Sequence, residues 1–218
     1  MKEPKRRDRV LLVHAIYSQR GGEETVLSAE AELLRRNGHD VEVFTVLNEE
    51  MEEISPFEQA KTTIWNQAAR RQIETTLKSM APDVVHVHNT FPLLSPGVFG
   101  AARKAGAAVV QTLHNYRRIC IAATLHREGA PCRLCVGKAI PWPGVRHGCY
   151  RASVPASVVA TTMELTHRAL GTYRRNIDRF IVLSEFAKTM FVAGGLAEGR
   201  LSVKRNFLPV DPGAGSGS

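Results

Sequence analysis

Long apolar runs are missing from this sequence. No stretch of about 18 consecutive apolar residues, the length that a membrane-spanning helix needs, occurs among the 218 residues. The basic residues 1–9 lead into an apolar run of only about five residues, which is too short for a secretory leader and is typical of a buried strand. We therefore expect a cytoplasmic protein.

Acidic and aromatic residues are scarce. The 29 Lys and Arg outnumber the 21 Asp and Glu, and the resulting charge of +8 favours anionic partners such as nucleotide diphosphates, acidic lipid headgroups or nucleic acid. Aromatic residues make up 6% of the chain and do not alternate with basic residues along one strand, so no nucleic-acid partner is expected. A zinc-containing nucleic-acid-binding module remains an alternative interpretation of the charge and the cysteines.

Two nucleotide-binding signatures are absent. The pair Gly21-Gly22 follows an apolar run and opens a helical pattern, yet it lacks the full G-x-G-x-x-G motif of dehydrogenases. It also lacks the Gly-Lys-Ser/Thr of P-loop ATPases, so both classes lose support. Bare N–H groups at such a helix start can face a phosphate or a sugar hydroxyl, although a plain tight turn is an equal alternative.

Strand and helix patterns alternate along the chain. Strands are expected at 9–14, 41–46, 83–88, 107–112, 179–183 and 201–204, and helices after Gly22 as far as Asn37-Gly38 and at 57–80, 95–105, 152–173 and 184–192. This order predicts an α/β fold, a Rossmann-like parallel sheet flanked by helices. We expect one domain at 1–208 with an irregular, cysteine-rich insertion at 116–150, and a truncated linker at 209–218.

Polar residues gather where the expected strands end. Ligands of open parallel sheets bind beyond the carboxyl ends of the strands. The residues at those ends are His14, Gly21, Gly22, His88, Asn89, Thr90, His114, Asn115, Tyr116, Arg117, Ser184 and Glu185. His114, in the last turn of its strand, is the candidate catalytic residue, whereas His86 lies within a strand and is expected to be a core histidine.

All four cysteines lie between Cys120 and Cys149, and in a reducing cytosol such a group favours a metal over disulfides. Cys132-Arg-Leu-Cys135 forms a chelating knuckle, twelve positions after Cys120 and fourteen before Cys149. Four thiolates suit a closed, structural zinc site, with His126 and His147 as reserve ligands. An iron–sulfur cluster, a redox dithiol and unmetallated thiols are the alternatives.

Several stretches together resemble the family-4 retaining glycosyltransferases of the GT-B fold. They are Gly21-Gly22-Glu23, the strand from Pro82 to Asn89, the strand end from Thr112 to Arg117, the stretch from Ile181 to Phe186, and the stretch from Val203 to Phe207. The segment from Cys120 to Tyr150 is similar to a cysteine-containing subgroup of that family. The motifs occur in the family's order and cover essentially the whole chain.

The resemblance implies two Rossmann-like domains that face each other across a cleft, with the acceptor on the N-terminal domain and a nucleotide-sugar donor on the C-terminal one. Gly22 would then lie near the donor diphosphate or the acceptor, and His114 would face the transferred sugar. The residues expected to bind substrate around them are Gly21, Gly22, His88, Asn89, Asn115, Arg117, Ser184 and Glu185. Asn206 would precede the crossing into the second domain.

The family's donor-binding domain, with its paired-glutamate motif, is not in the sequence. We therefore expect the acceptor-binding half of an enzyme that transfers a hexosyl group, with retention, from a nucleotide diphosphate to a glycan or lipid-linked acceptor. This half would be inactive alone, with a structural zinc. A non-catalytic half that pairs with a separate donor-binding subunit is another alternative. Arg146, Arg151, Arg168, Arg174 and Arg175 flank the 152–173 helix, which either rests on the inner face of an acidic membrane or packs on the sheet.

Overall fold

The computed structural model describes residues 7–16, 21–47, 54–207 and 213. Its first half contains β1 (Arg9–Ile16), α1 (Gly22–Arg36), β2 (Asp40–Leu47), α2 (Pro56–Ile64), α3 (Gln67–Met80), β3 (Val84–Asn89), α4 (Gly97–Lys104) and β4 (Ala108–Leu113). Its second half contains β5 (His126–Arg127), β6 (Ala130–Pro131), α5 (Trp142–Arg146), α6 (Val154–Ala169), α7 (Thr172–Asn176), β7 (Arg179–Val182), α8 (Glu185–Ala193), η2 (Glu198–Arg200) and β8 (Leu201–Val203).

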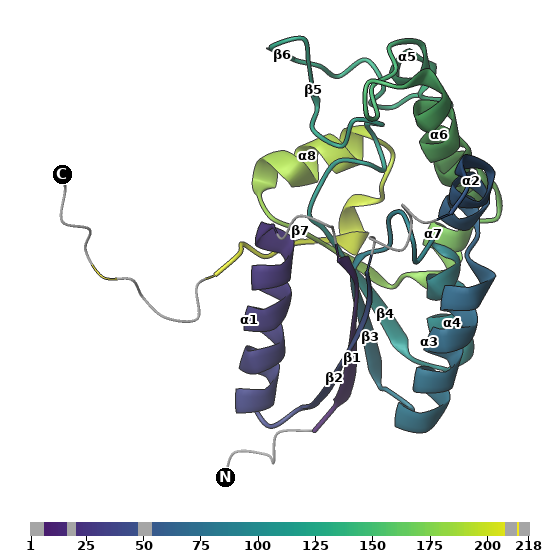
Figure 1. Cartoon of the computed structure of the whole chain (residues 1–218). Helices are drawn as coiled ribbons and strands as arrows, with labels where there is room; N and C mark the ends of the chain where they lie inside the picture. Colours follow the sequence, from purple (N-terminus) through teal and green to yellow (C-terminus); the bar gives the residue numbers. More distant parts are fainter. Residues whose placement is uncertain (1–6, 17–20, 48–53, 208–212, 214–218) are drawn as a thin grey trace.

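Six strands form one sheet in the order β2-β1-β3-β4-β7-β8, and every neighbouring pair is parallel. Helix α1 covers one face, while α3 and α4 cover the other (Figure 1). The α/β fold with a Rossmann-like parallel sheet flanked by helices is therefore confirmed. The chain reverses its direction of travel across the sheet between β1 and β3, and open α/β sheets bind ligands at such a switch point.

Burial on both faces explains why the strands have nearly continuous apolar sequences. Successive side chains of a strand point to opposite faces, so Leu12 packs with Leu27 of α1 while Leu11 packs in the core that contains Ile73 and Phe99. Leu11, Leu12, Ile73 and Phe99 each have 0% of their surface exposed. The sheet is therefore held between two packed cores, one on each face, and the loops at its carboxyl edge extend from this rigid base.

Two of the expected helices are broken in the structure. The single helix expected at 57–80 is wrong, because the chain turns at Trp65 and Asn66 between α2 and α3. The Asn66 side chain accepts a hydrogen bond from the Ala69 N–H (2.9 Å) and donates one to the Leu93 carbonyl (2.6 Å), which starts a new helix. The helix expected at 152–173 divides at Gly171, whose φ of +65° interrupts the helical backbone.

The expected insertion at 116–150 contains the two-residue strands β5 and β6 and the short helix α5. Together with α6 it stands above the carboxyl end of the sheet (Figure 1). No helix of the described residues combines the length and the apolar character that crossing a bilayer requires. Of the linker expected at 209–218, only Gly213 belongs to the described residues.

Candidate functional site

Three histidines from adjacent strands meet at the carboxyl edge of the sheet. His14 belongs to β1, His88 to β3, and His114 follows β4 directly. The rings of His88 and His114 stack with centroids 5.2 Å apart, and Nδ1 of His88 lies 3.0 Å from Nε2 of His114. The ring of His14 meets that of His88 edge-on at 6.3 Å. His114, the predicted catalytic residue, thus belongs to a row of three imidazoles. His14, His88 and His114 form this histidine row.

Burial keeps these imidazoles uncharged. It lowers the pKa of His88 to about 3, with a further contribution from His14. Burial likewise lowers the pKa of His114 to about 3, helped by His88 and His14 and opposed by Glu24. The pKa of His14 is lowered by burial, although a contact with Glu24 partly offsets the effect. Near neutral pH the row can therefore donate and accept hydrogen bonds without carrying a positive charge.

A buried carboxylate lies beneath the row. Glu30 of α1 is 4% exposed, and its Oε2 lies 3.0 Å from Nε2 of His88 and 3.5 Å from Nδ1 of His86. Lys204, which follows β8, forms an ion pair with the other oxygen of Glu30. His86 also shares a 2.7 Å hydrogen bond with the Thr112 hydroxyl, which fits the expected core histidine. The sequence analysis missed Glu30, although an acid on the apolar face of α1 was a usable signal.

The glycine pair lies on the same edge as the histidines. The Gly21 N–H donates to Oε2 of Glu24 at 2.7 Å, and Oε1 of Glu24 lies 3.4 Å from Nε2 of His14. Gly22 has open space where a side chain would be, with no heavy atom within 4 Å of an added Cβ among the described residues. Gly21 is therefore held in place by the protein, and Gly22 is accessible to a ligand at the start of α1.

Glu23 joins the glycine pair to the strand end of β4. Its Oε1 accepts a 3.5 Å hydrogen bond from the Asn115 amide, and its Oε2 is buried without a hydrogen-bond partner in the described part of the chain. Burial raises the pKa of Glu23 to about 7, against the lowering effect of Asn115. Glu23 was not among the predicted site residues. An unsatisfied carboxylate beside a glycine pair is a candidate partner for a ligand hydroxyl.

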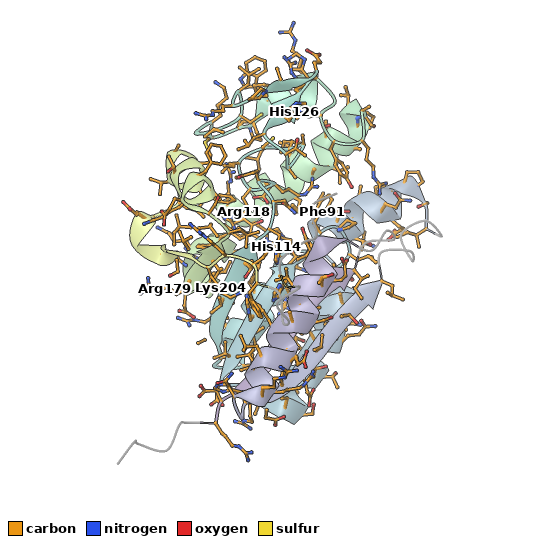
Figure 2. The ribbon with its side chains drawn as sticks, turned by 90° about the vertical axis from the view of Figure 1, so that its left-hand side faces the viewer. Phe91, His114, Arg118, His126, Arg179 and Lys204 are labelled. Atoms are coloured by element: carbon orange, nitrogen blue, oxygen red, sulfur yellow. The ribbon has the colours of Figure 1, made fainter. Side chains whose placement is uncertain are left out.

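A cavity of about 40 Å³ opens beside the row, lined in part by His88, His114, Asn115 and Arg117. The Arg117 guanidinium lies 4.0 Å from the centre of the Phe91 ring and 4.8 Å from that of Tyr150. It donates to the Ile121 carbonyl at 3.1 Å. In Figure 2, His114 lies below Phe91 and Arg118, at the upper end of the strands. Residues of the overlying segment thus lie above His114.

Three predicted substrate-binding residues have other contacts. The Asn89 side chain is used within the fold, donating to the Ala15 and Phe91 carbonyls and accepting from the Phe91 N–H. Ser184 caps α8 by accepting from the Ala187 N–H at 3.1 Å, and Glu185 is exposed. Neither Ser184 nor Glu185 lines the cavity beside His114. The structure thus gathers His88, His114, Asn115 and Arg117 around one cavity, with Gly22 reaching it through the Glu23–Asn115 contact. Asn89 also lines this cavity, whereas Ser184 and Glu185 lie outside it.

The four cysteines line one cavity of about 20 Å³, together with His126 and His147. Burial raises the pKa of the Cys135 thiol, and the other three cysteines raise it further. Among the described residues, the ligand atoms of Glu30, His86 and His88 all lie within 4.8 Å of one another, whereas no three of the cysteine sulfur atoms do. The four cysteines thus line a space of about one water or ion, and their sulfur atoms lie further apart than the ligands of a bound metal.

Solved structures similar to this chain include a galactosyltransferase and a protein in complex with UDP. The lipopolysaccharide outer core galactosyltransferase WaaB in its apo form is 14% identical with a TM-score of 0.46, and the match covers 89% of this chain and 44% of that one. Anabaena Alr3699/HepE in complex with UDP is 15% identical with a TM-score of 0.44, covering 92% and 44%. This chain therefore spans less than half the length of either protein.

Curated protein sequences give no match. The sequence profile of Glycosyltransferase Family 4 matches residues 20–211, which is most of the chain and includes the glycine pair, His88, His114 and the cysteines. The chain belongs to Glycosyltransferase Family 4.

Proposed function

We propose that this chain is the acceptor-side domain of a retaining glycosyltransferase of the GT-B architecture. The enzyme would transfer a hexosyl group from a nucleotide diphosphate to a glycan or lipid-linked acceptor. The observation that carries the proposal is the meeting of Gly22, Glu23 and His114 at one edge of the sheet, where Glu23 bonds to Asn115, the neighbour of His114. Family membership supplies the reaction class.

In the proposed reaction the bond between the anomeric carbon and the diphosphate oxygen breaks. The acceptor oxygen bonds to the same face of the anomeric carbon, and its proton passes to the leaving diphosphate. The protein's part is positioning and stabilisation of charge. A neutral His114 can hydrogen-bond a hydroxyl of the transferred sugar, and the open N–H end of α1 at Gly22 suits the departing anion.

Arg117 and Asn115 complete the proposed cleft. The Nε of Arg117 is buried without a hydrogen-bond partner among the described residues, so it has a donor left for an anion or a hydroxyl. Asn115 keeps its amide on Glu23 and its carbonyl oxygen on the Arg117 N–H at 3.1 Å. We assign Arg117 to substrate and Asn115 to holding Glu23 and Arg117 in position.

We further propose that residues 1–208 form one domain, that 209–218 lead toward a donor-binding domain, and that the chain alone does not transfer sugar. The nucleotide sugar would be bound chiefly by that second domain, and His114 would meet the sugar across the cleft. The resemblance of this chain to the family-4 glycosyltransferases of the GT-B fold supports this division. The carboxyl edge of the parallel sheet would be the side of the cleft that this domain contributes.

The cysteines are proposed to hold one structural zinc. Four thiols facing a cavity of about 20 Å³ match zinc in donor number and softness. The other three cysteines raise the pKa of the Cys135 thiol, and a cation among the thiols would reverse that effect. The zinc would fix Cys120, Cys132, Cys135 and Cys149 to one point and so stabilise the segment above the site.

The location is proposed to be cytoplasmic, with peripheral contact to an acidic membrane. Helix α6 packs chiefly against α2, α5 and α7, and its Val154 and Val158 are 48% and 44% exposed. Trp142 and Ile140 of the preceding segment are 53% and 57% exposed. Exposed apolar side chains beside Arg146 and Arg151 are the features of an interfacial contact.

Transfer activity tests the proposal, measured in the polypeptide that joins this chain to a donor-binding domain, with a panel of nucleotide sugars. His114→Ala should lower kcat/KM about 100-fold, the cost of removing one preorganised partner of developing charge. The matched control is His39→Ala, because His39 precedes β2 at the opposite edge of the sheet. Equal activity of the two variants, or no transfer by the parent with any nucleotide sugar, would overturn the proposal.

A further inference from the structure

A second, larger cavity lies beside the candidate site. Its volume is about 380 Å³, and its lining comes from the loop after β4, the α6–α7 turn, β7 and the turn after α8. Four arginines face it, Arg118, Arg168, Arg174 and Arg200, and none of the described residues that line it is Asp or Glu. Such a lining suits an anion.

Arg118 is the innermost of the four. It is 9% exposed, and its guanidinium carbon lies 3.5 Å from the centre of the Tyr173 ring and 5.2 Å from that of Phe180. Its Nε and Nη1 are buried and have no hydrogen-bond partner among the described residues. Leaving charged donors buried and unpaired is costly, so these two N–H groups indicate a missing acceptor.

Carbonyl groups orient two of the other arginines. Arg200 donates to the carbonyls of Arg174 and Tyr173 at 3.2 and 3.3 Å, and Arg168 donates to the Arg118 carbonyl. The nearby acid is Glu164, whose Oε2 lies 3.9 Å from Nε of Arg168. Carbonyl groups orient a guanidinium without neutralising its charge. The carboxylate of Glu164 therefore offsets one of the four positive charges that line the cavity.

Two consecutive glycines, Gly194 and Gly195, also line the cavity. An added Cβ at Gly194 would lie 2.2 Å from Cγ2 of Ile119, so the backbone approaches that side chain as closely as it can. Gly195 has a φ of +94° and no heavy atom within 4 Å of an added Cβ among the described residues. Since neither residue has a side chain, the cavity is lined by backbone at these two positions.

We propose that this cavity binds a phosphate or diphosphate group. Guanidinium groups pair with phosphate oxygens through parallel N–H donors, and the two free donors of Arg118 would take such a group at the inner end of the cavity. The anion would supply both the acceptor that Arg118 lacks and the negative charge that the lining lacks.

The cavity adjoins the candidate site. Arg118 and Tyr173 line both this cavity and the smaller one that contains His88 and His114. A phosphate bound here would therefore lie on the far side of the Arg118–Tyr173 pair from the histidine row. We assign it to the acceptor, which would be a phosphorylated or diphosphate-linked sugar. That assignment rests on the proposed function, whereas anion binding itself does not.

Calorimetric titration of the whole chain with inorganic diphosphate at fixed ionic strength tests the site. Arg118→Met should weaken binding about tenfold or more, since it removes hydrogen bonds between charged groups. Arg174→Gln should weaken it by a smaller factor. Arg175→Gln is the matched control, because Arg175 is exposed on the same helix and does not line the cavity. Circular dichroism checks that each variant folds. If Arg118→Met does not fold, the comparison of diphosphate binding by Arg174→Gln and Arg175→Gln tests the proposal.

No saturable binding by the parent chain would overturn the proposal. So would equal weakening in Arg174→Gln and Arg175→Gln, which would indicate an adventitious ion only. Vesicles of phosphatidate and of phosphatidylcholine distinguish the two sources of the phosphate. If diphosphate displaces the chain from phosphatidate vesicles, the group is borne by a lipid, and if diphosphate binds without vesicle binding, the acceptor is water-soluble. Because no donor is present, this result is independent of the transfer assay on His114→Ala.

Discussion

Nδ1 of His88 and Nε2 of His114 lie 3.0 Å apart, on the neighbouring strand ends of β3 and β4. Two neutral imidazoles at that distance share one proton, so one ring donates and the other accepts. Nε2 of His88 lies 3.0 Å from Oε2 of Glu30, without hydrogen-bond geometry, and the carboxylate favours a proton on that nitrogen. Nδ1 of His88 then accepts from His114, and Nδ1 of His114 is left as an acceptor for a substrate hydroxyl.

The first prediction concerns the charge of these rings. With pKa values lowered to about 3 by burial, His88 and His114 should both remain neutral from pH 8 down to pH 5. Nitrogen-15 NMR of the ring atoms should show Nε2 of His114 protonated and its Nδ1 unprotonated throughout. Titration of either ring near the ordinary histidine pKa of about 6.5 would contradict the buried arrangement.

The second prediction concerns stability against pH. Histidines with a lowered pKa bind fewer protons in the folded than in the unfolded state. The stability that His88 and His114 contribute is therefore fully present above about pH 6.5 and is lost as the pH drops toward 3. Each contributes a slope of up to about 1.4 kcal/mol per pH unit. Glu23, raised to about 7, acts in the opposite direction, losing stability as pH rises from 4.5 through 7.

Urea unfolding across this range separates the two effects. The chain should lose stability on acidification, because the histidines outnumber Glu23. Glu23→Gln should make this loss steeper between pH 4.5 and 7, since it removes the opposing group. Glu58→Gln is a suitable control, because Glu58 lies on the surface in α2. Parallel pH profiles for the Glu23 variant and the parent would contradict the shifted pKa of Glu23.

The third prediction concerns the ion pair beneath the histidine row. Lys204→Met removes the lysine partner of Glu30, a carboxylate that is 5% exposed, and should lower the free energy of unfolding by about 2 kcal/mol. Lys188→Met is the matched control, because the Lys188–Glu198 pair has a carboxylate that is 68% exposed and should change stability by less than about 1 kcal/mol. Similar losses in the free energy of unfolding of both variants, measured by urea denaturation, would show that the buried pair stabilises the fold no more than the exposed pair does.

The fourth prediction concerns the cysteines. Elemental analysis of the purified chain should find one zinc per molecule, and removing it with a chelator should lower the melting temperature. Cys132→Ser should lose the metal, whereas His147→Asn should retain it if the four thiols are the ligands. Iron in place of zinc, or a full complement of metal in Cys132→Ser, would refute this ligand set.

The sheet could be predicted because its strands are short apolar runs separated by helical patterns, two of which are followed by a glycine, Gly38 and Gly106. Gly38, with a φ of +87°, follows α1 where the helix was expected to stop. The break between α2 and α3 could not be predicted, since Asn66 bonds to Leu93, 27 residues away. The cap on the Ala69 N–H is local, but the bond to Leu93 that fixes the break depends on tertiary contact.

The site was predictable only in part. Strand ends in a parallel sheet share one edge, which is why His88 and His114 could be placed together. The same rule included Asn89, whose amide instead bonds to Ala15, 74 residues away. Glu30 lies on the apolar face of α1, which was a local signal of its burial, whereas the burial of Glu23 depends on tertiary contacts that a local pattern does not show.

The pairing of Glu30 with Lys204 fastens the middle of α1 to the segment that leaves the sheet after β8. The first turn of α1 carries Gly22, and Lys204 immediately follows the last strand. The helix that carries the proposed ligand-binding glycine and the point where the chain leaves the sheet are therefore joined by one ion pair.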